Sequence, residues 1–61
     1  MKDSLFNLAM RKFERRFLLN SLNAFGWNRK ATARFLKMSY RNLLYRIERL
    51  KIAPGEPSEY E

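Results

Sequence analysis

The side chains that could do chemistry in this sequence are mostly basic, and they gather in the second half of the chain. Residues 29–51 contain eight lysines and arginines and one acid, Glu48, so this segment alone accounts for the net charge of +7 of the 61 residues. Concentrated positive charge of this kind is the electrostatic signature of a polyanionic partner. Nucleic acid and an acidic membrane surface are the two partners that it indicates.

Helical periodicity divides the most mixed part of this segment, SYRNLLYRI at residues 39–47, into two surfaces. At 100° per residue, the inward-facing stripe is expected to comprise Tyr40, Leu43, Ile47 and Leu50. The opposite surface carries long hydrogen-bond donors and one aromatic ring, from Arg41, Tyr45 and Arg49, with Asn42 and Arg46 on one flank. The first surface is typical of core packing, and the second is typical of a reader of nucleic acid.

The outward residues of this stretch are the candidates for contacts with DNA bases. Arginine can bind guanine through two hydrogen bonds, and asparagine can bind adenine in the same way. In helix-turn-helix motifs the first turn of the second helix reaches the base edges. The expected base-reading residues are therefore Ser39, Tyr40, Arg41 and Asn42, with Tyr45 further along. Tyr40 lies toward the core side of the helix yet at the end nearest the bases, which leaves open whether it packs or reads.

A second set of basic residues suits the DNA backbone. The free N–H groups and the positive dipole at the start of a helix attract phosphate, and Arg29 and Lys30 add positive charge where a helix is expected to begin. Such contacts position a protein on DNA without reading its sequence. The expected phosphate-binding residues are Arg29, Lys30, Lys37, Arg46 and Arg49. For the first three, plain solvation is an equal alternative.

No catalytic residue, metal site or cofactor is expected. The chain has no histidine and no cysteine, and its acidic residues form no obvious pair for acid–base chemistry. We therefore do not expect an enzyme. The alternative is a basic amphipathic protein that binds a membrane surface, or one that binds nucleic acid without sequence preference. The turn and cap residues favour a folded domain, because an interfacial helix needs no such breaks.

Three helices must position these residues, and the pattern predicts an all-α domain. A long segment without proline or glycine begins at Ser4, where either Asp3 or Ser4 can cap a helix, and ends at Gly26, which suits a left-handed helix end. Asn28 is expected to cap a short second helix and Ser39 a third, with a tight turn between them and Pro54 as the end. The arrangement is one long helix followed by a helix-turn-helix motif.

The long helix carries apolar residues on more than one side. One stripe, at spacings of four, three and four, comprises Phe6, Met10, Phe13 and Phe17. The rest of the chain is too short to wrap six helical turns, and there is no cysteine for a disulfide staple. We expect a homodimer with this stripe as its interface. A second apolar set, at Leu5, Leu8, Leu19 and Leu22, leaves open which face of the helix pairs. The alternative is a central helix covered by both remaining helices.

The predicted organisation has three parts: an N-terminal extension at residues 1–3, the DNA-binding and dimerisation domain at residues 4–52, and an acidic flexible tail at residues 53–61. No apolar run reaches the length of a membrane span, and the start lacks a signal-peptide pattern. We expect a bacterial protein of the cytoplasm that associates with the nucleoid through double-stranded DNA and has no membrane partner.

Several motifs stand in an order and spacing that belong to one known family. They are the helical run FERRFLL with Glu14, the Gly26-Trp27-Asn28 triplet, and SYRNLLYRI, which is close to the family's SYRALLYKI. By these motifs the chain, from Leu5 to Ile52, resembles the C-terminal DNA-binding domain of the sigma-54-dependent activators of the NtrC family. That domain shares its fold with the nucleoid protein Fis.

The resemblance implies a homodimer whose long helices pair and whose two recognition helices read an inverted repeat in the activation of transcription. It also implies an ATPase domain N-terminal to this segment, so that sigma-54 RNA polymerase would be contacted only through domains absent here. Three residues depart from the family pattern: Thr32 stands for an alanine, and Lys37 and Lys51 each stand for a glycine. Lys37 is therefore expected to occupy the left-handed region, at a strain of roughly 1–2 kcal/mol.

Overall fold

The computed structural model describes residues 4–55 and contains three helices there, which confirms the predicted all-α domain. They are α1 (Leu5–Ala24), α2 (Arg29–Leu36) and α3 (Tyr40–Arg49). The expected N-terminal extension and residues 56–61 of the expected tail lie outside the described residues.

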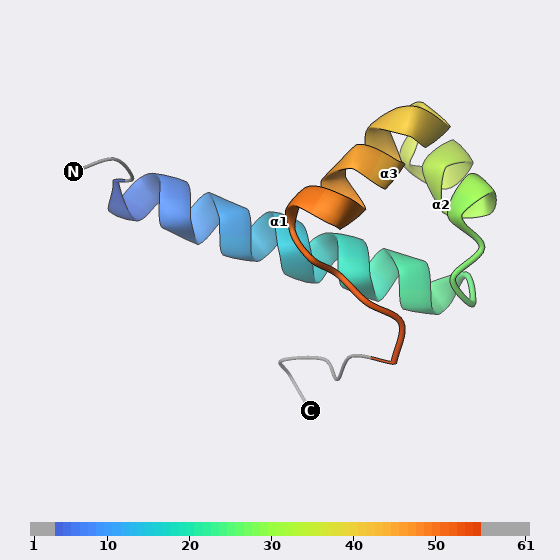
Figure 1. Ribbon diagram of the computed structural model, residues 1–61, viewed down its shortest axis with the longest axis horizontal. Coiled ribbons are helices and arrows are strands. Elements are labelled where there is room, and N and C mark those ends of the chain that lie inside the picture. The colour runs from blue at the N-terminus through green and yellow to red at the C-terminus, as the bar shows by residue number, and fades with distance from the viewer. Residues whose placement is uncertain (1–3, 56–61) are drawn as a thin grey trace.

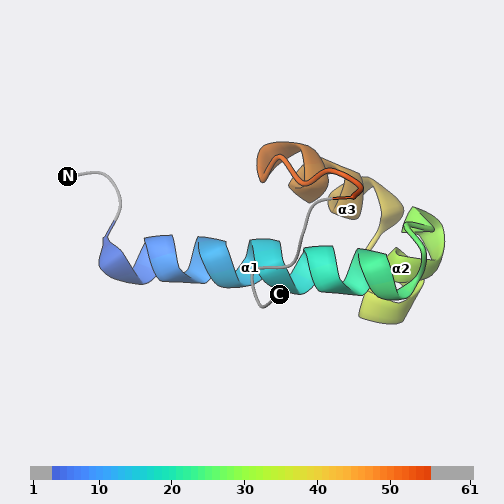
Figure 2. The ribbon, with the colours of Figure 1, turned by 90° about the horizontal axis from the view of Figure 1, so that it is seen from below.

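The two short helices pack against one half of the long one. Figures 1 and 2 both show α2 and α3 over the C-terminal half of α1, while the N-terminal half extends beyond them. Twenty residues make α1 about 30 Å long at 1.5 Å per residue, and the domain measures 37 × 28 × 16 Å. The length of α1 therefore sets the longest dimension, and its first turns extend beyond α2 and α3.

Each helix begins at the polar cap residue that the sequence predicts. The Ser4 hydroxyl oxygen accepts a hydrogen bond from the backbone N–H of Asn7 at 3.1 Å. The side-chain amide oxygen Oδ1 of Asn28 and the Ser39 hydroxyl oxygen accept equivalent bonds at 3.0 Å in the first turns of α2 and α3. Such a cap satisfies a backbone donor that the helix itself leaves unpaired, and stabilises a helix by about 1 kcal/mol.

The helices also end alike, each with a left-handed residue just after its last turn. These residues are Gly26 at φ 61°, Lys37 at φ 59° and Lys51 at φ 56°. The expectation for Lys37 is confirmed, and Lys51 replaces the second family glycine in the same conformation. Pro54 does not end α3, because the left-handed turn at Lys51 stops the helix at Arg49.

The residue after each left-handed turn is apolar and returns to the domain. Its N–H donates to the carbonyl five residues earlier: Trp27 to Leu22 at 2.7 Å, Met38 to Ala33 at 3.0 Å and Ile52 to Ile47 at 3.0 Å. All three side chains pack in or against the core. An apolar contact of this kind frequently accompanies the Schellman helix end. Trp27 thus covers the junction of α1 and α2, as its position in the sequence indicates.

The core is small and lies where the three helices meet. Its buried apolar members are Leu18, Leu19, Leu22, Ala33, Leu43, Leu50 and Ile52. Thr32 is also fully buried, and its hydroxyl donates to the Asn28 carbonyl at 2.9 Å, so the departure from alanine leaves no unpaired polar group. Tyr40 does not join this core: its side chain is 40% exposed. The helical wheel was wrong there because the Tyr40 ring lies beside Lys30 at the exposed start of α2, and not against the core.

Replacing Lys37 with glycine should stabilise the domain by about 0.5–1 kcal/mol, because glycine removes the left-handed penalty at a smaller entropic cost. Urea denaturation measures the change. The control is Arg34→Gly, at an exposed helical position in α2, which should destabilise by about 1 kcal/mol. A loss of stability in Lys37→Gly would contradict this account of the turn.

Candidate nucleic-acid interface

The first turn of α3 presents the predicted base-reading residues together on the surface. Ser39, Tyr40, Arg41, Asn42 and Tyr45 are all exposed, whereas Leu43 on the opposite side is fully buried. The separation of the two faces follows from the helical period, and it confirms that these side chains are accessible. Their contact with bases remains a prediction.

The start of α2 lies beside the start of α3 through a contact between two candidate residues. The Lys30 ammonium nitrogen sits above the Tyr40 ring, 5.6 Å from its centroid, a cation–π arrangement. Arg29 and Lys30 occupy the first turn of α2, where backbone N–H groups and the helix dipole favour an anion. An expected phosphate contact and an expected base contact are therefore neighbours.

One acidic residue of α1 holds the last turns of α3. The Glu14 carboxylate accepts hydrogen bonds from the guanidinium groups of Arg46 and Arg49, the latter with Nη2 to Oε2 at 3.1 Å. Arg46 also donates from Nε to the Asn42 Oδ1 at 3.2 Å. The Oδ1 of the Asn42 amide is therefore occupied. Its Nδ2, a hydrogen-bond donor, has no partner among the described contacts. Arg46 and Arg49, both expected at phosphates, are thus oriented from α1.

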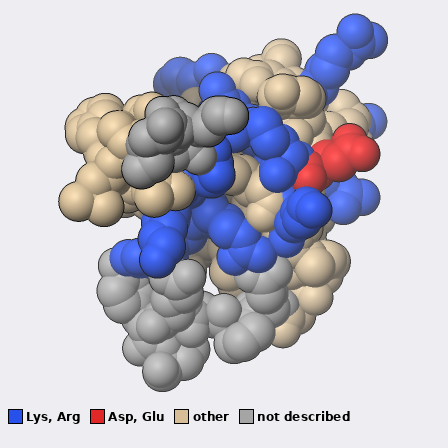
Figure 3. All heavy atoms as spheres, turned by 60° about the vertical axis from the view of Figure 1, so that its left-hand side comes forward, with Lys and Arg blue, Asp and Glu red and all other residues tan. Residues whose placement is uncertain are grey.

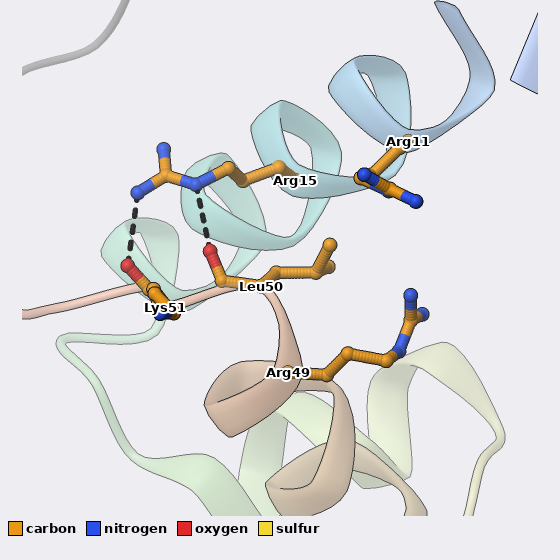
Figure 4. A pocket seen from close by; sticks show the side chains of 5 residues that line it. All are labelled: Arg11, Arg15, Arg49, Leu50 and Lys51. Carbon is orange, nitrogen blue, oxygen red and sulfur yellow. Dashed lines mark hydrogen bonds between the residues drawn. The ribbon is translucent and has the colours of Figure 1, made fainter. Parts of the chain in front are cut away.

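Arg15 forms a second link between α1 and the end of α3. Its Nε and Nη2 donate to the backbone carbonyls of Leu50 and Lys51, each at 2.9 Å (Figure 4). Carbonyls at the end of a helix lack partners within it, and a cation there also suits the negative end of the dipole. Arg15 therefore caps the C-terminal end of α3, although it precedes Leu50 by 35 positions in the chain.

Sequence reasoning missed both links. Glu14 appeared only as part of a family motif, and Arg15 was not singled out. The signal for Glu14 was its isolation, because it is the only acidic residue between Ser4 and Ile47. Arg15 has no comparable signal, since its partners are backbone carbonyls.

Positive charge extends well beyond the first turn of α3. Figure 3 brings forward the side on which α1 begins, and Lys and Arg side chains cover much of that face. No helix among the described residues is both long and apolar enough to cross a membrane.

Comparison with known proteins identifies the helix-turn-helix. The family described as "Bacterial regulatory protein, Fis family" matches residues 9–50, which span most of α1 and all of α2 and α3. Glu14, Arg15 and every candidate DNA contact lie within this range. No curated protein and no solved structure matches the chain.

Replacing Glu14 with glutamine should lower the free energy of unfolding by about 0.5–1 kcal/mol, because partly exposed ion pairs contribute about that much. Thermal denaturation at low and high salt measures it, and the difference should shrink as salt screens the pairs. Glu48→Gln is the matched control on the exposed side of α3. Equal effects of the two substitutions would show that the link to α1 adds nothing.

Proposed function

Because the chain belongs to the Fis family of bacterial regulatory proteins, whose pattern covers about two thirds of it, we propose that it is a homodimer that binds double-stranded DNA sequence-specifically to regulate transcription. The observation that carries the proposal is the exposed first turn of α3, where Arg41 and Asn42 stand opposite the buried Leu43. Exposed donors on a helix that is fixed from behind suit the edges of bases in the major groove.

Within this proposal the residues of α3 divide the work. Arg41 binds guanine, for which arginine has a matching pair of donors. Asn42, whose Oδ1 already accepts from Arg46, offers its Nδ2 donor to a base acceptor. Ser39, Tyr40 and Tyr45 complete the base-reading set.

The backbone contacts surround that reading turn. Arg29 and Lys30 bind a phosphate at the start of α2, and Lys37 adds a contact from the turn. Arg46 and Arg49 bind phosphate beside the last turns of α3, already oriented by Glu14. Together these five residues position α3 in the groove.

The dimer rests on the stripe of Phe6, Met10, Phe13 and Phe17. Its side chains are between 46% and 69% exposed, and the Phe13 and Phe17 rings stack with centroids 5.9 Å apart. At 100° per residue this stripe lies on the side of α1 opposite Leu18, Leu19 and Leu22, which face α2 and α3. Contiguous exposed apolar surface of this kind marks an interaction site, and a second α1 has the same length and the same stripe.

We propose further that this domain serves a sigma-54-dependent activator of the NtrC family. Support comes from SYRNLLYRI, the segment closest to the family's own. Contact with the polymerase then falls to other domains of such a protein. The place of action is the nucleoid in the bacterial cytoplasm.

Replacing Arg41 with alanine should reduce discrimination between specific and scrambled duplexes by roughly 1–3 kcal/mol, while affinity for the scrambled duplex changes little. Competition binding measures both affinities. Lys30→Ala is the control. It should lower the affinity for both duplexes equally and reduce the log–log salt slope by about one, the value for one phosphate contact. An equal loss on both duplexes in Arg41→Ala would assign Arg41 to phosphate instead.

Replacing Phe13 with glutamate should convert the dimer to a monomer, because it places a charge in the centre of the proposed interface. Sedimentation equilibrium at micromolar concentration should give 7.4 kDa for this variant and twice that mass for the unaltered chain. Phe35→Glu is the control, since Phe35 is 65% exposed but lies on α2. A mass of 7.4 kDa for the unaltered chain would contradict the dimer, and binding governed by anionic lipid would favour a membrane role for the stripe.

A further inference from the structure

A basic hollow lies where the end of α3 meets the middle of α1, away from the reading turn. Its volume is about 380 Å³, and it is lined by Arg11, Arg15, Arg49, Leu50 and Lys51. Four of the five lining residues are cations and none is acidic. Figure 4 shows the Arg11 and Arg49 guanidinium groups on the same side of Leu50, with Arg15 and Lys51 on its other side.

Two of these cations are already fixed in place. Arg15 donates to the Leu50 and Lys51 carbonyls, and Arg49 donates to the Glu14 carboxylate. A ligand therefore meets guanidinium groups whose side-chain entropy is already largely lost. The buried Leu50 forms an apolar part of the wall, which strengthens electrostatic attraction beside it.

We propose that this hollow binds a phosphate group, held by the guanidinium groups of Arg11 and Arg49, with Lys51 adding positive charge from the other side of Leu50. Guanidinium forks match the paired oxygens of a phosphate, and the Lys51 ammonium adds a point charge. A hollow of this size accommodates a phosphate with the atoms on either side of it. Arg11, on α1, lies outside the helix-turn-helix and outside the phosphate contacts proposed above, whereas Arg49 is one of them.

The backbone of DNA beside the recognition site is the source that the geometry favours, and this assignment rests on the proposed function. From Arg41 to Arg49 the helix advances about 12 Å, and the major groove is also about 12 Å wide. With the first turn at the base edges, the end of α3 thus stands beside the flanking phosphates. Arg49 connects the two regions, since its guanidinium lies 5.9 Å from the Tyr45 ring centroid. A free phosphate or nucleotide has the same chemistry and is the other source.

Two duplexes distinguish a flanking contact from the reading contacts. One ends at the edges of the bound repeat, and the other extends it by about one helical turn on each side. Arg11→Ala should weaken binding to the extended duplex roughly three- to tenfold and lower its log–log salt slope by about 0.9 for each phosphate lost. Binding to the trimmed duplex should not change. Lys12→Ala, the same charge loss on the adjacent exposed residue of α1, should affect both duplexes equally and only slightly.

A second variant removes another of the hollow's four cations, Lys51, without threatening the fold. Lys51→Gly deletes the ammonium and at the same time relaxes a residue at φ 56°. It should show the same selective loss on the extended duplex. Equal losses on both duplexes in Arg11→Ala and Lys51→Gly would overturn a flanking DNA contact.

Titration with inorganic phosphate, against chloride at matched ionic strength, tests the other source. Shifts of the Leu50 and Lys51 amide signals in NMR spectra that vanish in Arg11→Ala, without a selective loss on extended DNA, would identify a free phosphate ligand. No shifts and no selective loss would overturn the phosphate site altogether. If the unaltered chain binds no duplex, the proposed function fails, and the phosphate titration alone still decides the hollow.

Discussion

The orientation of the recognition helix depends on one small apolar contact region, in which Leu19 and Leu22 of α1 and Leu43 of α3 share a single core and are fully buried. A chain of 61 residues has little else to bury. Because this core lies under the C-terminal half of α1, it fixes α3 with its donors outward. Because α2 and α3 pack only on this core, the stripe from Phe6 to Phe17 is left uncovered. The exposed first turn of α3 and the exposed apolar stripe of α1 are therefore two consequences of one packing arrangement.

Polar links from α1 complete what the core begins. Glu14 holds Arg46 and Arg49, and Arg15 caps the carbonyls at the end of α3. Each link joins residues more than 30 positions apart. The helix α1 therefore holds α3 by polar contacts as well as by apolar packing. A carboxylate beside arginines that are expected to bind phosphate also lowers the local positive charge. Glu14 thus orients these side chains at some electrostatic cost to DNA affinity.

Local features of the fold could be predicted from the sequence, and long-range polar pairing could not. Ser4, Asn28 and Ser39 cap helices because their side chains satisfy nearby N–H groups, and helical period alone separated Leu43 from Arg41. Tyr40 was misplaced because the wheel gives a direction but not which side chain, here that of Lys30 on α2, meets the ring. Arg15 escaped because backbone carbonyls, its partners, carry no residue-specific signal. For the candidate site, the exposure of the first turn of α3 could be predicted from the sequence. The contacts of Glu14 and Arg15 that hold α3 against α1 could not.

The central claim is that two copies of α3, paired through α1, read bases in the major groove. Selection of bound duplexes from a random pool tests it most directly, because partner, symmetry and half-site emerge together. The account predicts an enriched inverted repeat whose half-sites are centred about one helical turn, 34–36 Å, or a multiple of it apart. Enrichment of an unsymmetrical single site, or no enrichment at all over random duplex, would contradict it.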